Sequence, residues 1–217
     1  MGKGIGICCI LLGIVCVLAS AGFVVCNKIE AQNGAQFSQS LLQNVQAGME
    51  ETKRIQIEQA ENRAEETIPE GQDETVPPEM ATIPAGEYDS IGILSIPALE
   101  LELPVLTDWS YEKLKKAPCH YYGSCYESDF VIAAHNYTAH FGRLSELRQG
   151  DLVFFTDAAG QTHGYEVVLT ETLPPTAIEE MVVSGFDLSL YTCTPGGSSR
   201  VTVRCRRVNV YKAELHT

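Results

Sequence analysis

Three residues of types that carry out acyl transfer stand at the ends of apolar segments. Cys193 closes the apolar run at residues 188–193, and a turn-forming cluster at residues 194–199 separates it from Arg200. A hairpin at this turn returns the chain beside itself and brings the guanidinium near the thiol, where it can lower the thiol pKa or hold a developing oxyanion. His135 ends another apolar run and begins a polar loop, which suits an acid/base. The spacing therefore predicts a nucleophile, an anion stabiliser and an acid/base.

Other arginines and the last cysteine offer alternatives on the same predicted strand. Arg204, Arg206 and Arg207 follow Arg200 in a segment that alternates like a strand. Arg204 would share a face with Arg200, but Arg200 stands closest to the turn and is the preferred anion stabiliser. Cys205 is one residue out of phase with both, so we expect it to face the core rather than to act as a nucleophile.

The histidines have to be weighed together, because an isolated histidine is more often a surface or core residue than a catalytic one. From the residues alone, His135 is equally well explained as catalytic or as structural. His120 is interpreted as structural, and His140, His163 and His216 are interpreted as surface or turn residues.

The remaining cysteines predict structure rather than chemistry. Cys119 and Cys125 lie six residues apart and either form a disulfide outside the cell or remain free thiols, and the sequence leaves both alternatives open. Metal binding is less favoured, because only His120 lies close by. Four further cysteines in the N-terminal apolar segment are interpreted as small apolar residues: Cys8, Cys9, Cys16 and Cys26.

Three segments together resemble the sortases, the cysteine transpeptidases of bacterial cell surfaces. Residues 189–193, Ser-Leu-Tyr-Thr-Cys, followed by Arg200, are similar to the Thr-Leu-x-Thr-Cys motif and its arginine, with Ser in place of the first Thr. Residues 132–136, Ile-Ala-Ala-His-Asn, are similar to the histidine strand, with Ala in place of Gly. Residues 91–106 resemble the first two strands. The segments occur in the family's order, and the resemblance covers about residues 88–210.

The resemblance implies a function and a site. Cys193 would attack a sorting signal of the Leu-Pro-x-Thr-Gly kind in a surface protein or pilin and form a thioester, while His135 would protonate the departing amine. Arg200, with substrate or oxyanion contacts at Thr192 and Thr194, would stabilise the intermediate. An amine of a cell-wall precursor, or a pilin lysine, would accept the acyl group, and water could replace it slowly, as in a thiol protease.

The chain beyond residue 87 has an all-β texture, because short apolar runs alternate with clusters of Gly, Pro, Asn and Asp. The resemblance implies an eight-stranded barrel with short helices. Helical turns are predicted at 111–116 with a Ser110 cap, at 140–147, and at 176–181 with a Thr176 cap. The predicted strands cover residues 91–96, 101–106, 130–135, 152–156, 163–172, 188–193 and 200–210, with a further short strand near Tyr121.

The predicted organisation has three parts: a transmembrane signal-anchor at 1–26, an acidic stem or linker at 27–86, and the catalytic barrel at 87–217. The segment from Gly4 to Cys26 is uncharged and long enough to cross a bilayer core. A cleaved signal peptide is the alternative, and the retained anchor is preferred because the apolar run continues past the small residues at 19–21. The barrel is expected outside the cell, on a single-pass membrane protein, if the N-terminus stays in the cytoplasm.

The stem carries much of the chain's charge. The net charge is -13, and residues 50–80 alone hold ten acidic against three basic residues. A helix is expected over 35–66 and a Pro-stiffened linker beyond it. A solvated spacer that holds the domain off the membrane is preferred to a partner-binding coiled coil, because the heptads are broken. No basic patch indicates nucleic acid as a partner.

Two other function classes compete with the transpeptidase. One is a catalytically inactive, membrane-anchored barrel that binds peptide or wall polymer. The other is an L,D-transpeptidase, in which a histidine should precede the cysteine by a short spacer that contains Ser or Asn. No such spacer precedes Cys193, so this class is disfavoured. No cofactor is expected, and calcium activation is not predicted, because the acidic residues are merely scattered: Glu146, Glu171, Glu179 and Glu180. The stem lacks an Asp-Pro-aromatic lid motif, which argues mildly against a lidded, pilus-polymerising subclass.

Overall fold

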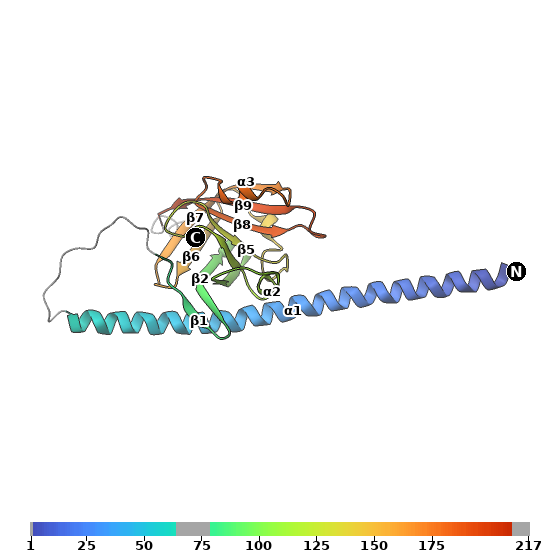
Figure 1. Cartoon of the computed structure of the whole chain (residues 1–217), viewed down its shortest axis with the longest axis horizontal. Helices are drawn as coiled ribbons and strands as arrows, with labels where there is room; N and C mark the ends of the chain where they lie inside the picture. Colours follow the sequence, from blue (N-terminus) through green and yellow to red (C-terminus); the bar gives the residue numbers. More distant parts are fainter. Residues whose placement is uncertain (1, 64–78, 210–217) are drawn as a thin grey trace.

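The computed structural model describes residues 2–63 and 79–209 and consists of one long helix lying along a β-barrel (Figure 1). The strands alternate with short helices along the chain in the order α1 (Gly2–Arg63), β1 (Ile83–Ala85), β2 (Tyr88–Ile96), η1 (Pro97–Leu99), β3 (Leu101–Leu106), α2 (Tyr111–Leu114), β4 (Cys119–Tyr122), β5 (Phe130–Ala133), η2 (Leu144–Glu146), β6 (Leu152–Asp157), β7 (Thr162–Leu173), α3 (Ile178–Val182), β8 (Leu188–Cys193) and β9 (Arg200–Val208).

The sheet closes on itself. Its strand order is β1-β2-β3-β4-β5-β8-β9-β7-β6, and β6 also pairs with β2, so the eight strands β2 to β9 form a barrel with β1 outside it. The pairs β3–β4 and β5–β8 are parallel, and the others are antiparallel. The prediction of an all-β, eight-stranded barrel with short helices after a long apolar helix is confirmed.

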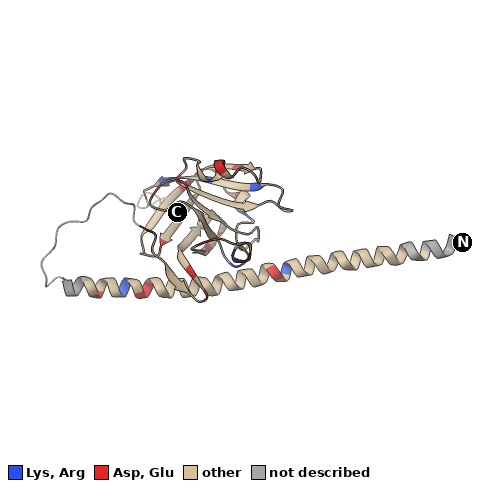
Figure 2. Cartoon of the chain, in the orientation of Figure 1, with Lys and Arg blue, Asp and Glu red and all other residues tan. Residues whose placement is uncertain are grey.

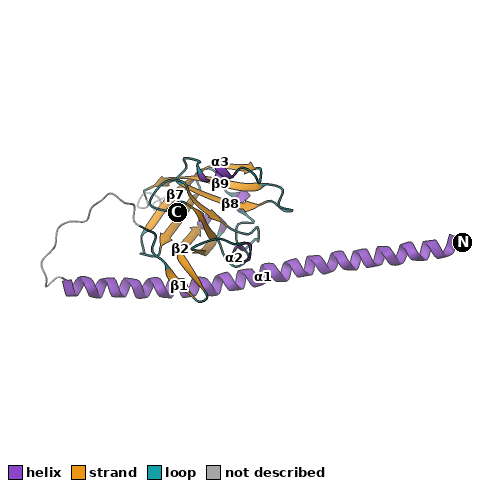
Figure 3. Cartoon of the chain, in the orientation of Figure 1, coloured by secondary structure: helices purple, strands orange, loops and turns teal. Residues whose placement is uncertain are grey.

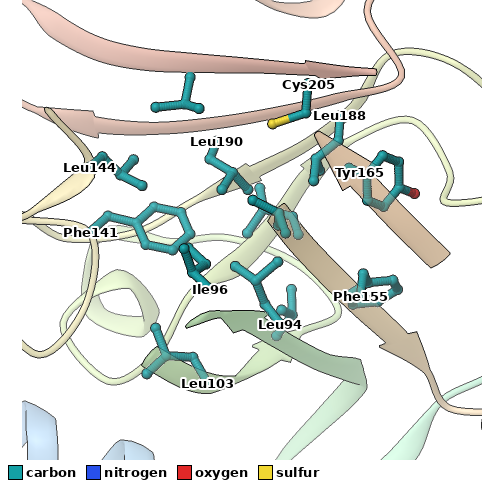
Figure 4. Packing of buried hydrophobic residues seen from close by; sticks show 14 of the residues in the cluster. Leu94, Ile96, Leu103, Phe141, Leu144, Phe155, Tyr165, Leu188, Leu190 and Cys205 are labelled. Atoms are coloured by element: carbon teal, nitrogen blue, oxygen red, sulfur yellow. The ribbon is translucent and has the colours of Figure 1, made fainter. Parts of the chain in front are cut away.

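The barrel interior is filled by alternate residues of its strands, as the period of two requires. In β6, buried and half-buried residues alternate along the strand. Figure 4 shows side chains from β2, β3, β6 to β9 and the segment at 141–144 converging on one core. Phe130 of β5 belongs to the same core, and its ring packs edge to face with that of Phe155, with their centroids 5.1 Å apart.

The predicted elements match closely, with three differences. Strand β1 was not predicted, because three residues are too few for an alternating pattern. Ser110 caps α2 as expected, since its hydroxyl accepts the Lys113 amide hydrogen at 3.2 Å. The Thr176 cap is wrong: Ala177 begins α3 without a side-chain cap. In the predicted helical turn at 140–147, only Leu144–Glu146 form a short 3-10 helix.

The stem part of α1 is docked on the barrel rather than held away from it (Figure 3). Leu41 and Val45 are buried in an apolar cluster that also includes barrel residues such as Ile93 and Leu106. The interpretation of the stem as a solvated spacer is therefore wrong for the face that carries Leu41 and Val45, whereas Ile55 is exposed. The predicted Pro-containing linker lies almost wholly at 64–78, outside the described residues.

The part of α1 from Ile10 to Val25 is apolar and exposed. It contains no Lys, Arg, Asp or Glu, and Figure 2 shows this stretch of the helix in tan. An 18-residue window there has a mean hydropathy of 2.4 and is not buried in the structure. This helix is therefore long and apolar enough to cross a membrane, a test that a signal sequence also passes.

Candidate active site

The predicted nucleophile lies at an accessible end of the barrel. Cys193 is the last residue of β8, is half-buried, and pairs in register with Arg200, the first residue of β9. The turn between them requires glycine, because Gly196 and Gly197 adopt φ angles of 83° and 75°. The hairpin predicted from the turn chemistry is therefore present, and it sets the thiol strand beside the guanidinium strand.

The side chain of Arg200 is held by the same turn. Its Nη1 donates hydrogen bonds to the carbonyl oxygens of Gly197 and Ser199, both at 3.1 Å. Arg200 also lines a small groove next to the site. The other residues of this groove come from β4, β8 and the segment that contains α3: Tyr121, Pro174, Pro175, Ala177, Ile178, Met181 and Tyr191.

The connection between β7 and β8 supplies most of the lining of this groove. The apolar run at 130–134 does not line it, because all five side chains are buried in the core. A run that is apolar at every position faces protein on both sides of its strand, which is the pattern of a buried parallel strand.

The predicted acid/base lies at the same end as the thiol, because β5 and β8 run parallel. Ala133 is in register with Tyr191, so the residues two positions further along, His135 and Cys193, leave neighbouring strands side by side. The Ala134 amide donates to the Tyr191 carbonyl at 3.2 Å, and the Thr192 hydroxyl donates to the Ala134 carbonyl at 2.8 Å. The structure thus brings all three predicted residues to one end of the barrel.

The two predicted oxyanion residues have other partners. Thr192 is buried, and its hydroxyl joins the nucleophile strand to the histidine strand. The Thr194 amide donates to the Ser199 carbonyl at 3.0 Å, and its hydroxyl accepts the Ser199 amide hydrogen at 3.0 Å. In this conformation Thr194 closes the turn, so neither threonine has a free donor aimed at Cys193.

His135 is half-buried and packs against an aromatic ring. The ring centroids of His135 and Tyr137 lie 3.9 Å apart, at 31°. Nδ1 of His135 is buried and has no hydrogen-bond partner among the described residues. Burial lowers the pKa of His135, Glu30 of the stem helix acts in the opposite direction, and Lys115 adds to the lowering. The imidazole is therefore mostly neutral at pH 7.

The alternative arginines serve the fold. Arg204 is buried, and its guanidinium donates to the Glu171 carboxylate and the Ser189 hydroxyl, both at 2.8 Å. Arg206 packs over the Phe186 ring. Arg207 donates to the Cys125 carbonyl at 2.7 Å. Arg200 alone among these four lines the groove next to Cys193.

A second cysteine–histidine cluster lies inside the barrel. The ligand atoms of Cys125, Asp157 and His163 lie within 4.8 Å of one another, and all three residues are buried. The Arg207 guanidinium lies 3.3 Å from Nδ1 of His163, and since a guanidinium only donates, Nε2 carries the proton and donates to Asp157 at 2.9 Å. Both ring nitrogens are thus engaged, and a cation already adjoins the cluster, so it does not fit a metal ion.

The thiol of this internal cluster does not suit nucleophilic chemistry. Burial raises the pKa of Cys125 to about 12, and the neighbouring Asp157 carboxylate acts in the same direction. The pKa of Asp157 is itself lowered: burial would raise it, but hydrogen bonds from His163, the Gln161 amide and Tyr126 outweigh burial. The cluster has the composition of a catalytic triad in a place that no substrate reaches.

Two histidine assignments from the sequence are wrong. His140 and His163 are both buried rather than at the surface. Short polar stretches with Gly and Thr predict exposed turns, but here the histidine rings fold inward and fill the interior. His120 fits its structural interpretation, because its ring nitrogens contact the carbonyls of Thr107 and Gly123 at 3.2 and 2.8 Å. His216 lies outside the described residues.

The structure also distinguishes between a disulfide and free thiols at Cys119 and Cys125. Cys119 and Cys125 are free, and they belong to different apolar clusters, one beneath the stem helix and one in the barrel core. Cys205 is fully buried in the same core as Cys125, as its phase predicted.

Sequence reasoning missed the residues that surround His135. Tyr137 lies only two residues after His135 in the sequence. Glu30 and Gly34 lie in the stem, about a hundred residues upstream. No sequence signal pointed to these two residues, because both precede the helix expected over 35–66 and their contacts with the barrel exist only in the folded chain.

Comparisons with known proteins agree with this barrel and its cysteine hairpin. The family model described as "Sortase domain" matches residues 94–208. Sortase A from Corynebacterium diphtheriae aligns with 57% of this chain and 63% of its own, at 25% identity and a TM-score of 0.52. Sortase C1 from Streptococcus suis aligns with 55% and 73%, at 32% identity and a TM-score of 0.50. A pilus-related sortase C of group B Streptococcus aligns with 56% and 68%, at 29% identity and a TM-score of 0.50.

The structure places the predicted cysteine, histidine and arginine at one end of a closed barrel. Because the family model matches more than half of the 217 residues, this chain belongs to the sortase family. The chain spans less than two thirds of the length of the Corynebacterium diphtheriae structure. A comparison with curated proteins found no match.

Proposed function

We propose that this protein is a membrane-anchored cysteine transpeptidase that joins a surface protein or pilin, through its sorting signal, to an amine. The observation that carries the proposal is the pairing of Cys193 with Arg200 at the barrel end where His135 also lies, next to a groove. These residue types at one accessible site support acyl transfer through a thioester.

The proposed reaction proceeds in two halves. Neutral His135 takes the thiol proton of Cys193 as the sulfur attacks the carbonyl carbon of a threonine-type residue in a Leu-Pro-x-Thr-Gly-like signal. The imidazolium then protonates the leaving amine as the C–N bond breaks, and a thioester remains. An amine of a wall precursor or pilin attacks the thioester, its proton passes to His135, and the C–S bond breaks. Water in place of the amine gives hydrolysis, and no cofactor takes part.

Arg200 is the proposed anion stabiliser. Its guanidinium is held at the groove by the Gly197 and Ser199 carbonyls, so it needs little reorganisation to face a developing oxyanion. Thr192 is proposed to support the site indirectly, because its hydroxyl ties the nucleophile strand to the histidine strand.

The docked helix supports a particular orientation at the membrane. Glu30 pairs with Lys115 at 2.8 Å, whereas Gly48, further along α1, packs beside Ile83. The barrel face next to His135 thus lies nearer the apolar segment than β1 does. At 1.5 Å per residue, Gly34 lies about 12 Å beyond Cys26 along the helix. We propose that the catalytic end faces the outer membrane surface, where a membrane-bound sorting signal and a lipid-linked amine would both be available.

Mass spectrometry of the full chain in detergent micelles tests the proposal. The protein is incubated with a panel of Leu-Pro-x-Thr-Gly-like peptides and simple amines, beside Cys193→Ala and Arg200→Ala. A thioacyl adduct on Cys193 and an amine-dependent product are expected, with no adduct in Cys193→Ala. Peptide binding that survives Cys193→Ala unchanged, with no adduct in the wild type, would indicate the inactive, peptide-binding barrel instead.

A further inference from the structure

The imidazole of His135 lacks the usual means of orientation. Catalytic histidines are commonly held by a hydrogen bond from the second ring nitrogen to a carboxylate or carbonyl. Here Nδ1 is buried without such a partner among the described residues. The closest ring contact is the face of Tyr137, 3.9 Å away between centroids. Packing against Tyr137, rather than a hydrogen bond, must set the angle of the imidazole.

The Tyr137 ring also lies against the stem helix at its Cδ2–Cε2 edge. A Cβ atom at position 34 would lie 3.2 and 3.3 Å from Cε2 and Cδ2 of Tyr137, and 2.5 Å from the Lys115 carbonyl oxygen. Only glycine lets α1 approach so closely. The Tyr137 hydroxyl is buried without a partner among the described residues, so the ring itself makes the contact.

The loop between His135 and Tyr137 has little freedom to compensate. The Tyr137 carbonyl accepts the amide hydrogens of His140 and Gly142, both at 2.9 Å, and the Phe141 amide donates to the His135 carbonyl at 3.2 Å. A Cβ at Gly142 would lie 2.6 Å from the Asn136 carbonyl oxygen. A displacement of Tyr137 would therefore be passed on to His135 rather than absorbed by the loop.

Charged groups on the helix and the barrel meet at the same place. Glu30 of α1 pairs with Lys115, and both act on His135 in opposite directions. Tyr137 and His140 are the titratable groups of the loop itself, and burial lowers the pKa of His140 to about 4, so its ring is neutral at pH 7. The stem thus contributes both a surface and a charge to the surroundings of the imidazole.

We propose that the stem helix is a working part of the active site: Gly34 seats Tyr137, and Tyr137 positions the His135 imidazole for proton transfer. Tyr137 and Gly34 are positioning residues, since neither is placed to touch the substrate. The inference rests on the proposed acyl transfer at Cys193. It extends that function by making the segment next to the membrane necessary for catalysis, not only for anchoring.

A matched pair of glycine variants on the same helix tests the proposal in the full chain in detergent micelles. Gly34→Ala pushes on Tyr137 and the Lys115 backbone. Gly48→Ala pushes on the Ile83 side chain in β1, with Cγ2 2.4 Å from the new Cβ, far along the helix from the His135 loop. Both substitutions improve helix propensity equally. Gly34→Ala should lower kcat for acylation about tenfold or more with little change in KM, and Gly48→Ala should change it less than about twofold.

A double-mutant cycle tests whether Gly34 affects His135 through the Tyr137 ring. Tyr137→Ala should lose about as much rate as Gly34→Ala, and Tyr137→Phe should restore most of it, because the ring and not the hydroxyl makes the contact. Adding Gly34→Ala to Tyr137→Ala should lower kcat little further, since the proposed route to His135 passes through that ring, whereas the clash with the Lys115 carbonyl remains in the double variant. The inference would be overturned if the rate loss of the double variant equalled the product of the two single losses. It would also be overturned if Gly34→Ala and Gly48→Ala lowered the rate equally.

A second readout separates this inference from the proposed function. In carbon-labelled histidine spectra, with His135→Gln used for assignment, Gly34→Ala should move the His135 titration toward 6.5, because a displaced Tyr137 exposes the imidazole. Gly48→Ala should not move it. If the wild type forms no thioacyl adduct, the proposed function fails. An unmoved titration in Gly34→Ala, with the wild type active, overturns the positioning role alone.

Discussion

The barrel contains two cysteine–histidine groups whose compositions are similar and whose surroundings are opposite. Cys193 and His135 lie at an open end beside a groove, with Arg200 next to the thiol strand. Cys125 and His163 lie in the core with Asp157, and burial raises the pKa of the thiol to about 12. Residue types alone would favour the internal group, which has a complete triad composition. Solvent access and charge environment instead favour the group with an arginine and no carboxylate.

Replacing the two thiols is the strongest test of this comparison. Cys193→Ala should abolish thioacyl formation, a loss of roughly four orders of magnitude or more. Cys125→Ala should leave the rate within about twofold and lower the free energy of unfolding by about 1 kcal/mol, because it leaves a small cavity. Single-turnover acylation and urea unfolding of each variant measure the two effects. Lost acylation in a folded Cys125→Ala would reverse the assignment.

Alkylation of the wild-type protein tests the difference in exposure between the Cys193 and Cys125 thiols without mutation. Iodoacetamide at pH 7 should modify Cys193 about a hundredfold faster than Cys119, Cys125 or Cys205, because burial shields those three thiols and raises the pKa of each to about 12. Peptide-resolved mass spectrometry measures each site. In urea the four rates should converge, and rates that differ little in the folded protein would refute the exposure difference.

Arg200 and Arg204, two of the four arginines of β9, should differ in the same way. Arg204→Leu should destabilise the fold by about 3 kcal/mol, since it leaves the Ser189 hydroxyl and the Glu171 carboxylate without their partner. Arg200→Ala should leave stability within about 0.5 kcal/mol, because the side chain is half-exposed and donates hydrogen bonds only to turn carbonyls, but should slow acylation. Thermal unfolding measures the first effect. Equal stability of both variants would contradict the structural role of Arg204.

The buried histidine beneath the stem makes stability depend on pH. His140 has a pKa near 4 in the fold against 6.5 when unfolded, so the unfolded chain binds more protons between these values. Stability should therefore fall as pH drops from about 6.5 to 4, by at most about 3 kcal/mol. His140→Leu should flatten this part of the profile in urea titrations at several pH values. An unchanged slope in that variant would mean that other groups cause it.

Most of the site was predictable because its signals are local. A strand ending in Cys193, a glycine-rich turn and Arg200 specify a hairpin within the thirteen residues 188–200, and hairpin geometry alone pairs the two residues. His135 was placed with less certainty, because its approach to Cys193 depends on the parallel pairing of β5 and β8, which are separated by more than fifty residues. The buried His163 and His140 were misplaced because short polar segments do not reveal which side chains turn inward.

The apolar helix, the barrel strands, the cysteine hairpin and the burial of Cys205 can all be predicted from the sequence, since each follows from a periodicity or a turn within one segment. The docking of the stem on the barrel, the position of Glu30 and Gly34 near His135, and the enclosure of the Cys125 thiol emerge only from the folded chain. The physical reason is that these outcomes depend on contacts between distant segments. Burial, a close backbone approach and a neighbouring charge exist only once the chain has folded.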